Sequence, residues 1–378
     1  MPVTEIDKTT GSLNPPITVA LRSEILGEAR KIYIQLPEGY GQCQRNYPVF
    51  IVLDGEWLFD IVRANLLFYS DVEVMGNILP KMILVGIENT DRDRDFVPTP
   101  DPQDPPMFKT AGKADIFAKF LSQELFPYLE HEYQVLPDRT VLGWSFSGLF
   151  ALYAVVQLQD LFDNYLCLGP AIWWDNELVI RLFKETPLRN KKRAVITCGT
   201  DERGGEVYES VQNLLKFLED EKPANFDFEY LEFDDVGHSW SVPQAIAQGL
   251  LHLFKGYVPK DEIKTTAALK EYYKNLSDLW GYDVIAPDWF LLDLMNRLWE
   301  ADDRDSAFEV LEILLVHHPN SSLAHFYRGK YLALLNQMPE ALESYWEALK
   351  VELSHPVPNN IYLRSYRKKF EEFSKTSN

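Results

Sequence analysis

The sequence contains little cysteine, no long apolar run and a deficit of basic residues, and each shortage excludes a class of protein. Only three cysteines (Cys43, Cys167 and Cys198) occur among 378 residues, too few and too widely spaced for a disulfide framework or a paired-cysteine metal site. No stretch reaches the roughly 18 consecutive apolar residues of a membrane-spanning helix. Asp and Glu outnumber Lys and Arg by 57 to 37, a net charge of −20 that repels phosphate backbones and anionic lipids. We therefore expect neither nucleic acid nor a membrane as a partner.

The N-terminal segment, MPVTEIDKTTGSLNPP, also lacks the features of a secretory signal. It has neither a basic start nor an apolar run of about 7 to 15 residues. With so few cysteines, this predicts a cytoplasmic protein. Apolar residues make up 46% and charged residues 25% of the chain, as in ordinary globular proteins, and the length favours two domains.

The first predicted domain, residues 1–258, alternates short β-rich runs with longer helical patterns. This alternation is typical of a mostly parallel sheet covered by helices, and runs such as VFIVL and MILVGI are typical of strands buried on both faces. The proline-rich segment 91–112 is predicted to be a loop, with neither strand nor helix. Strands are predicted at 30–36, 49–53, 82–87, 140–142, 165–168, 194–198 and 226–233, and helices at 115–131, 149–159 and 207–221.

The second predicted domain, residues 259–378, has no β pattern and is expected to be all-α. The segments SAFEVLEILL and EALESYWEAL align at a separation of 34 residues, which places Ala307 and Ala341 in register. Pro319 ends the first unit, and Gly329 is a small residue in the first helix of the second. Helix pairs of this period resemble tetratricopeptide repeats. About two repeats are expected to pack as a supporting bundle, to bind a peptide, or to pair two copies of the chain.

The sharpest chemical signal is VLGWSFSGLFAL, where a β-rich run passes directly into a helix. In a nucleophile elbow a serine lies on this tight turn, and the residues two before and two after it must be small. Gly143 and Ser147 occupy these positions around Ser145, although glycine is usual at the second of them. Ser145 is therefore the candidate nucleophile.

A serine hydroxyl needs a histidine to take its proton and a carboxylate to orient that histidine. His238 follows the last predicted strand and precedes a helix, where a loop can return the imidazole to the serine. The acid should follow the preceding strand, where CGTDE supplies both Asp201 and Glu202. Adjacent side chains point in different directions, and the sequence pattern alone leaves both open.

The oxyanion hole needs two backbone amides directed at the developing negative charge. One is expected from Phe146, which follows the nucleophile. The other is expected from the loop LDGEW after an earlier strand, where Gly55 lets the backbone turn inward and the amide of Glu56, with that of Gly55, is the candidate.

Six ordered motifs make the first domain similar to the esterase D-like branch of the α/β-hydrolases, and within it to the enterobactin and bacillibactin esterases. They are PVFIVLDGEWLF, ENTDRDRDFVPT, GWSFSGLFAL, GPAIWWDN, CGTDE and GHSW. The resemblance implies an α/β-hydrolase fold and a serine esterase without metal or organic cofactor. It favours Glu202 over Asp201, because the acid of this branch commonly occupies the fourth position of such a turn. It also supports the Glu56 amide.

The resemblance further implies a small ester substrate, and the siderophore esters among these substrates are strongly anionic when they carry iron. An acidic domain would need local arginines for them, and Arg92 and Arg94 are the candidates. The alternative is that Asp91, Asp93 and Asp95 neutralise both. Trp173 and Trp174 are candidates for the wall of an aryl pocket, or for the core.

The leading hypothesis is thus a serine carboxylesterase, with siderophore esters as one substrate class. Thioesters such as S-formylglutathione, and acyl transfer to an alcohol, use the same residues. A hypothesis of another class is a catalytically silent scaffold that binds partners through its helical domain.

Overall fold

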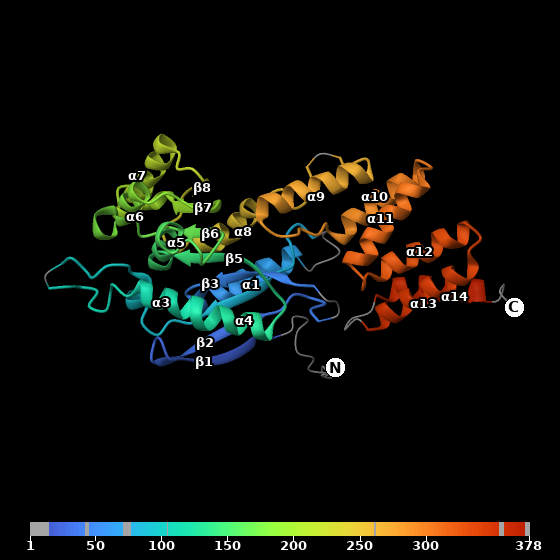
Figure 1. Ribbon diagram of the computed structural model, residues 1–378, viewed down its shortest axis with the longest axis horizontal. Helices are drawn as coiled ribbons and strands as arrows, with labels where there is room; N and C mark the ends of the chain where they lie inside the picture. Colours follow the sequence, from blue (N-terminus) through green and yellow to red (C-terminus); the bar gives the residue numbers. More distant parts are fainter. Residues whose placement is uncertain are drawn as a thin grey trace, which may run out of the picture. The chain divides into compact units, whose positions relative to one another are not determined.

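The computed structural model describes residues 15–41, 45–70, 77–103, 105–260, 262–354 and 359–374 (Figure 1). The described residues form two compact units. The first comprises those within 1–38, 46–67 and 81–253, and the second those within 39–45, 68–80 and 254–378. Cys43 lies outside the described residues, and so does most of the segment 1–16, which was predicted not to be a secretory signal. No described helix is long and apolar enough to cross a membrane.

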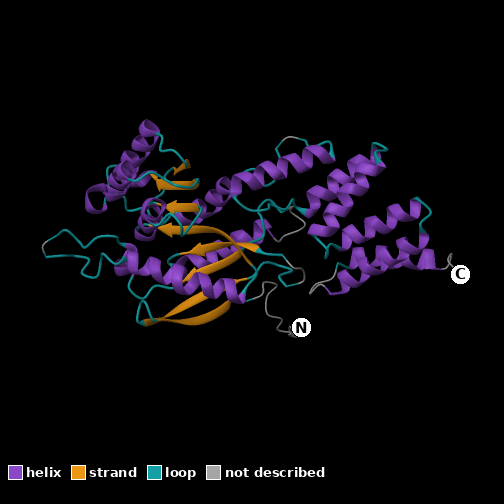
Figure 2. Ribbon diagram, viewed as in Figure 1, coloured by secondary structure: helices purple, strands orange, loops and turns teal. Residues whose placement is uncertain are grey.

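The first unit is built on one eight-stranded sheet, drawn in orange in Figure 2. Its strand order is β1-β2-β4-β3-β5-β6-β7-β8, with β2 antiparallel to both β1 and β4 and every other pair parallel. The strands are β1 (Ile17–Ser23), β2 (Glu28–Gln35), β3 (Tyr47–Val52), β4 (Ile83–Ile87), β5 (Val135–Trp144), β6 (Asn164–Leu168), β7 (Lys192–Gly199) and β8 (Phe226–Phe233).

Every residue of β3, β4 and β6 is buried, so both faces of the central sheet are covered, as the continuous apolar runs predict. The predicted α/β class is therefore confirmed. The connecting helices are α1 (Gly55–Ser70), α2 (Arg92–Phe96), α3 (Ala114–Phe120), the π-helix η2 (Leu121–Leu125), α4 (Phe126–Glu132), α5 (Phe146–Gln157), α6 (Trp174–Glu185), the 3₁₀ turn η3 (Thr200–Glu202), α7 (Glu206–Glu221) and α8 (Val242–Leu253).

Two features differ from the prediction. Strand β1 was not predicted; it lies at the sheet edge, and most of its residues are exposed or half-buried. The segment 91–112 was predicted to have no helix, which is wrong, because α2 forms at its start. The Asp91 side chain caps this helix by accepting a hydrogen bond from the Arg94 amide (3.1 Å).

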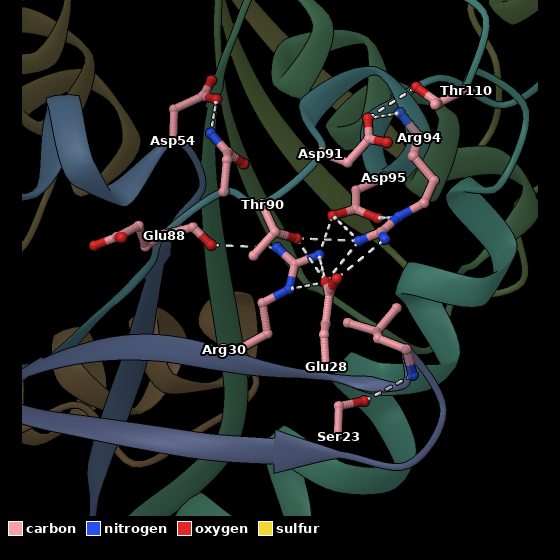
Figure 3. A network of polar contacts seen from close by, with 12 residues as sticks. Ser23, Glu28, Arg30, Asp54, Glu88, Thr90, Asp91, Arg94, Asp95 and Thr110 are labelled. Atoms are coloured by element: carbon pink, nitrogen blue, oxygen red, sulfur yellow. Dashed lines mark hydrogen bonds and ion pairs between the residues drawn. The ribbon is translucent and has the colours of Figure 1, made fainter.

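Helix α2 is held against the sheet by a buried ionic network (Figure 3). Arg30 of β2 is fully buried and pairs with the buried Asp95 and with Glu28. Arg94 contributes bonds to Glu28 (2.7 Å) and to Asp95 (2.7 Å). The hydrogen bond from Arg94 lowers the pKa of Glu28 to about 2. Two guanidinium groups thus neutralise two carboxylates, which makes burial of these charges tolerable.

A second buried carboxylate, Asp138, lies near the beginning of β5, away from the carboxyl end of that strand. Burial, and to a lesser degree the neighbouring Asp163 carboxylate, raise its pKa to about 7. Asn164 donates a hydrogen bond to it (3.3 Å). Asp138 therefore keeps a proton in the folded chain at pH values where the unfolded chain has lost it.

We expect this to make stability fall as pH rises. The unfolded chain loses the proton near its ordinary pKa of 3.8 and the folded chain near 7, so folding becomes less favourable between these values. Relative to Asp138→Asn, the free energy of unfolding of the wild type should fall by up to about 4 kcal/mol from pH 4 to pH 7 and then stay level. Urea unfolding at several pH values measures this, and parallel curves for the two proteins would contradict it.

The second unit is helical, as predicted for the C-terminal part of the chain. In α12, a Cβ added to Gly329 would lie 2.8 Å from the ring of Tyr345 in α13, so glycine allows the close approach of these two helices. The tetratricopeptide likeness of the unit stays a prediction. Its helices are α9 (Thr266–Trp280), α10 (Asp288–Glu300), α11 (Arg304–His317), α12 (Ser322–Leu334), α13 (Met338–Ser354) and α14 (Asn360–Ser374).

Candidate active site

Ser145 lies at the tight turn between β5 and α5. Its backbone has φ 60° and ψ −113°, a conformation that residues with a side chain rarely adopt. The turn is held on both sides, because the Ser145 amide donates to the Leu168 carbonyl (2.9 Å) and the Ser145 carbonyl accepts from the Ala171 amide (3.1 Å). This is the geometry that a nucleophile elbow requires.

The two small residues of the elbow serve different purposes. A Cβ on Gly143 would overlap with the backbone carbonyl of Ser147, so only glycine fits at this position. Ser147 is fully buried and its hydroxyl is engaged: it lies 2.6 Å from the Trp144 amide and 2.6 Å from a carboxylate oxygen of Asp54. The departure from glycine at Ser147 therefore adds hydrogen bonds that a glycine cannot make.

His238 and Glu202 form a hydrogen-bonded pair. Glu202 ends the η3 turn after β7, and His238 lies in the connection between β8 and α8. His238 Nδ1 lies 2.9 Å from Glu202 Oε2, and a Cβ added to Gly169, which follows β6, would lie 2.9 Å from the same Nδ1. The imidazole also packs on the Trp144 ring, with centroids 5.2 Å apart. The pair thus lies beside the residues that flank Ser145.

Of the two candidate acids, the structure brings only Glu202 to the histidine. Its second oxygen, Oε1, accepts a hydrogen bond from the Gly199 amide (3.3 Å) and lies 3.8 Å from Cys198 Sγ. Asp201 is exposed, and its amide donates to the Val236 carbonyl (3.2 Å). Burial raises the pKa of the Cys198 thiol to about 12, so this cysteine stays protonated at neutral pH and is a poor nucleophile.

The candidate oxyanion amides lie at the beginnings of two helices. Phe146 begins α5, and Gly55 and Glu56 begin α1. First-turn amides have no acceptor within their own helix, and the helix dipole makes this end attractive to negative charge. Since β3 and β5 are neighbouring parallel strands, both helices begin at the same edge of the sheet.

The turn that leads into α1 differs in detail from the prediction. The left-handed backbone conformation falls on Asp54 (φ 54°), whereas Gly55 is needed for close packing, because a Cβ on it would lie 2.7 Å from the Ile87 amide. The Glu56 carboxylate accepts bonds from the Asn89 amide (3.1 Å) and side chain (2.8 Å).

Arg92 and Arg94 bind carboxylates of the chain itself. Arg92 donates to Asp54 (2.7 Å) and to the Trp144 carbonyl (2.8 Å). Arg94 binds Glu28 and Asp95, as described above. Of the three aspartates that the sequence offers as neutralising partners, only Asp95 is an ion-pair partner of either arginine among the described residues. The contact of these arginines with an anionic substrate stays a prediction.

The tryptophan pair is divided between surface and core. Trp174 is almost fully buried and donates from Nε1 to Thr99 (2.9 Å), whereas Trp173 keeps part of its surface. Both rings pack near Phe146, at centroid distances of 5.7 and 6.0 Å. Phe108 of the proline-rich segment lies against Phe146 as well (5.1 Å). Of the two tryptophans, Trp173 is the one that a ligand can reach.

Sequence reasoning did not identify the buried Asp54 as part of this site. Its aspartate-glycine pair is typical of the start of a turn, and the unusual serine at position 147 was the one available signal that a polar partner lay nearby. The described residues contain no group of three or more His, Cys, Asp or Glu that could hold a metal ion.

Comparison with known proteins gives a consistent family. The model of the putative esterase family matches residues 23–242, more than half of the chain. Ferri-bacillibactin esterase BesA of Bacillus subtilis is 24% identical over 224 residues, which cover 54% of this chain and 78% of BesA. The siderophore enterobactin esterase of Emericella nidulans is 36% identical over a shorter stretch of 90 residues, 22% of this chain and 29% of that protein.

Solved structures extend the likeness to the fold. The IroE-like serine hydrolase of Shewanella oneidensis superposes with a TM-score of 0.71 at 26% identity, covering 80% of this chain and 99% of that one. An uncharacterised protein of Capnocytophaga ochracea, 18% identical, has the same fold over 95% of this chain and 99% of its own, with a TM-score of 0.62. The chain has an α/β-hydrolase fold and belongs to the putative esterase family.

Proposed function

We propose that the chain is a serine carboxylesterase that works through an acyl-enzyme intermediate. The observation that carries this proposal is the strained serine at the elbow together with the His238–Glu202 pair at the same edge of the sheet. In open α/β sheets the carboxyl ends of the strands form the crevice in which ligands bind. Membership of the esterase family agrees with this chemistry.

In the proposed reaction, Ser145 Oγ attacks the ester carbonyl while His238 accepts its proton. Glu202 holds the Nδ1 proton of the imidazole and stabilises the imidazolium that forms. The amides of Phe146 and Glu56, with Gly55, stabilise the tetrahedral oxyanion. The imidazolium then protonates the leaving alcohol, the acyl-enzyme forms, and water activated by the same histidine releases the acid.

For the substrate we propose an ester of the siderophore class. Two relatives are named as esterases of bacillibactin and enterobactin. Exposed aromatic surface lies close in sequence to the proposed machinery: Trp57 follows Glu56 and is 54% exposed, and Trp240, two residues after His238, is 83% exposed. Such rings offer stacking surface to an aryl group.

The proposal predicts a burst of product followed by steady turnover. With p-nitrophenyl acetate, rapid mixing should release about one p-nitrophenol per chain before the steady state, because this activated ester acylates the serine faster than water releases the acyl group. A catecholate trilactone should be hydrolysed with a kcat/KM at least about 10-fold above that of p-nitrophenyl acetate, since more of the substrate contacts the protein. Absence of turnover with both esters and with a thioester would contradict the proposal and favour a silent scaffold.

A further inference from the structure

A cluster of three polar side chains, two of them fully buried and the third half-buried, connects the two segments that carry the proposed oxyanion amides. Its members are Asp54, at the turn into α1, Arg92 of α2 and Ser147 of the elbow. Asp54 is fully buried, and its two carboxylate oxygens accept four hydrogen bonds: from Asn89 (2.7 Å), from Arg92 Nε (2.7 Å) and Nη2 (3.1 Å), and from Ser147 Oγ (2.6 Å). We call these three residues the Asp54 cluster.

The Ser147 hydroxyl has one proton, and its surroundings determine where that proton goes. The Trp144 amide donates to Oγ (2.6 Å), so the oxygen is already an acceptor. The remaining choices are the Asp54 carboxylate at 2.6 Å and the Trp144 carbonyl at 2.9 Å, and the latter already accepts from Arg92 (2.8 Å). The charged acceptor is the stronger one, so Ser147 donates to Asp54. The elbow and the turn before α1 are thereby joined directly.

Arg92 also connects the turn before α1 to the elbow. It binds the Asp54 carboxylate through two nitrogens and the carbonyl of Trp144, the residue before the nucleophile, through one of them. Its guanidinium also lies over the rings of Trp57 (5.7 Å) and Phe146 (5.6 Å), one from each segment. A planar group with fixed donors holds two partners at a defined separation better than a lysine could.

The orientation of Asp54 sets the first turn of α1. Its backbone is left-handed, and its carbonyl accepts bonds from the amides of Trp57 and Leu58, both at 3.0 Å. The Gly55 and Glu56 amides belong to the stretch of backbone between the Asp54 carbonyl and these two amides. Fixing the Asp54 side chain against Ser147 and Arg92 therefore fixes how these amides are presented relative to Phe146.

We propose that the Asp54 cluster sets the spacing of the two oxyanion donors, with Asp54, Arg92 and Ser147 as positioning residues for the acylation step. This inference rests on the proposed function. It assigns a purpose to serine where the elbow usually has glycine, and it gives Arg92 a role within the protein that needs no substrate anion. Burying the Asp54–Arg92 ion pair is costly, which agrees with a role in geometry rather than in stability.

The test is the rate at which a fluorophosphonate modifies the wild type, Ser147→Ala and Ser147→Gly. Phosphonylation also builds negative charge on an oxygen, so its rate reports the oxyanion amides. Loss of one direct donor slows acyl transfer by about 100- to 1000-fold. In the Ser147 variants both amides are still present but displaced, so the rate should fall less than when a donor is lost. We expect a fall of about 10- to 100-fold in the second-order rate constant of labelling and in kcat for p-nitrophenyl acetate. KM should change less than about twofold.

Rate and extent of labelling separate positioning from folding. If the variants fold, labelling is slow but still reaches one per chain, whereas misfolding lowers the final extent. Ser210→Ala is the matched control, because Ser210 is a buried serine whose hydroxyl bonds a carbonyl of its own helix, α7 (3.1 Å). It should label at the wild-type rate. Arg92→Gln should slow labelling as well. In the double variant with Ser147→Ala, the labelling rate should fall by less than the product of the two single reductions, since both residues act on Asp54.

The outcomes of these labelling and kinetic measurements that would contradict the positioning role are the following. Equal rates for wild type and both Ser147 variants would overturn this inference and leave the proposed function standing. A raised KM at unchanged kcat, or a lowered extent at an unchanged rate, would overturn it too, because these show substrate binding or folding instead of positioning. A wild type that does not react at all would overturn the proposed function, and this inference with it.

Discussion

Ser145→Ala should reduce kcat for ester hydrolysis by about 10⁴- to 10⁶-fold, the loss seen when a serine nucleophile is removed from such a triad. The alanine lacks the oxygen that attacks the carbonyl, whereas the hydrogen bonds of the turn come from the backbone and persist. We expect little change in KM. Steady-state kinetics with p-nitrophenyl acetate measures the effect.

Thermal unfolding of the same variant is the control. Serine and alanine both carry a Cβ and must accommodate the same positive φ at this turn, so the melting temperature should stay within a few degrees of the wild type. Activity retained above a hundredth of the wild-type value, in a protein free of contaminating esterase, would show that another group is the nucleophile.

Glu202→Gln should lower kcat by about 10²- to 10⁴-fold, whereas Asp201→Asn should leave it within about twofold. Glu202 accepts from His238 Nδ1 at 2.9 Å, and a glutamine amide can turn its NH₂ toward that nitrogen and stabilise the wrong tautomer. Asp201 is exposed and its side chain is not the partner of the histidine. The pre-steady-state burst rate distinguishes loss of acylation from loss of deacylation.

The adjacent position makes this an internally controlled comparison. Both substitutions replace a carboxylate by an amide in the same turn and change the net charge equally. A larger loss for Asp201→Asn than for Glu202→Gln would mean that the turn rearranges in solution and that Asp201 is the acid.

Much of the fold could be predicted because the central strands are buried on both faces and so appear as uninterrupted apolar runs. For example, the fully buried β6 (Asn164–Leu168) was predicted at 165–168, within one residue of its observed ends. Edge strand β1 (ITVALRS) was missed, and most of its residues remain accessible to solvent, so it is not one of the strands buried on both faces. Helix α2 was missed because four of its five residues, RDRDF, are charged and prolines follow it closely. Its ion pairs with Arg30 and Glu28 of β2 join residues 65 and 66 positions apart in the sequence.

The residues of the candidate site likewise include some that could be predicted from the sequence and some that could not. Ser145, His238 and Glu202 could be selected because each follows a predicted parallel strand, and the carboxyl ends of such strands share one edge. Asp54 could not be selected, because its partners Arg92 and Ser147 lie 38 and 93 positions away and no periodicity connects them. The left-handed turn at Asp175, Asn176 and Glu177, next to the tryptophan pair, likewise has no glycine to mark it.

Mass spectrometry of the folded wild type after treatment with a fluorophosphonate tests the proposed nucleophile most directly. We expect one adduct per chain, on the peptide that contains Ser145, with none on Ser145→Ala or on denatured wild type. An unmodified folded protein, or an adduct on any residue other than Ser145, would contradict it.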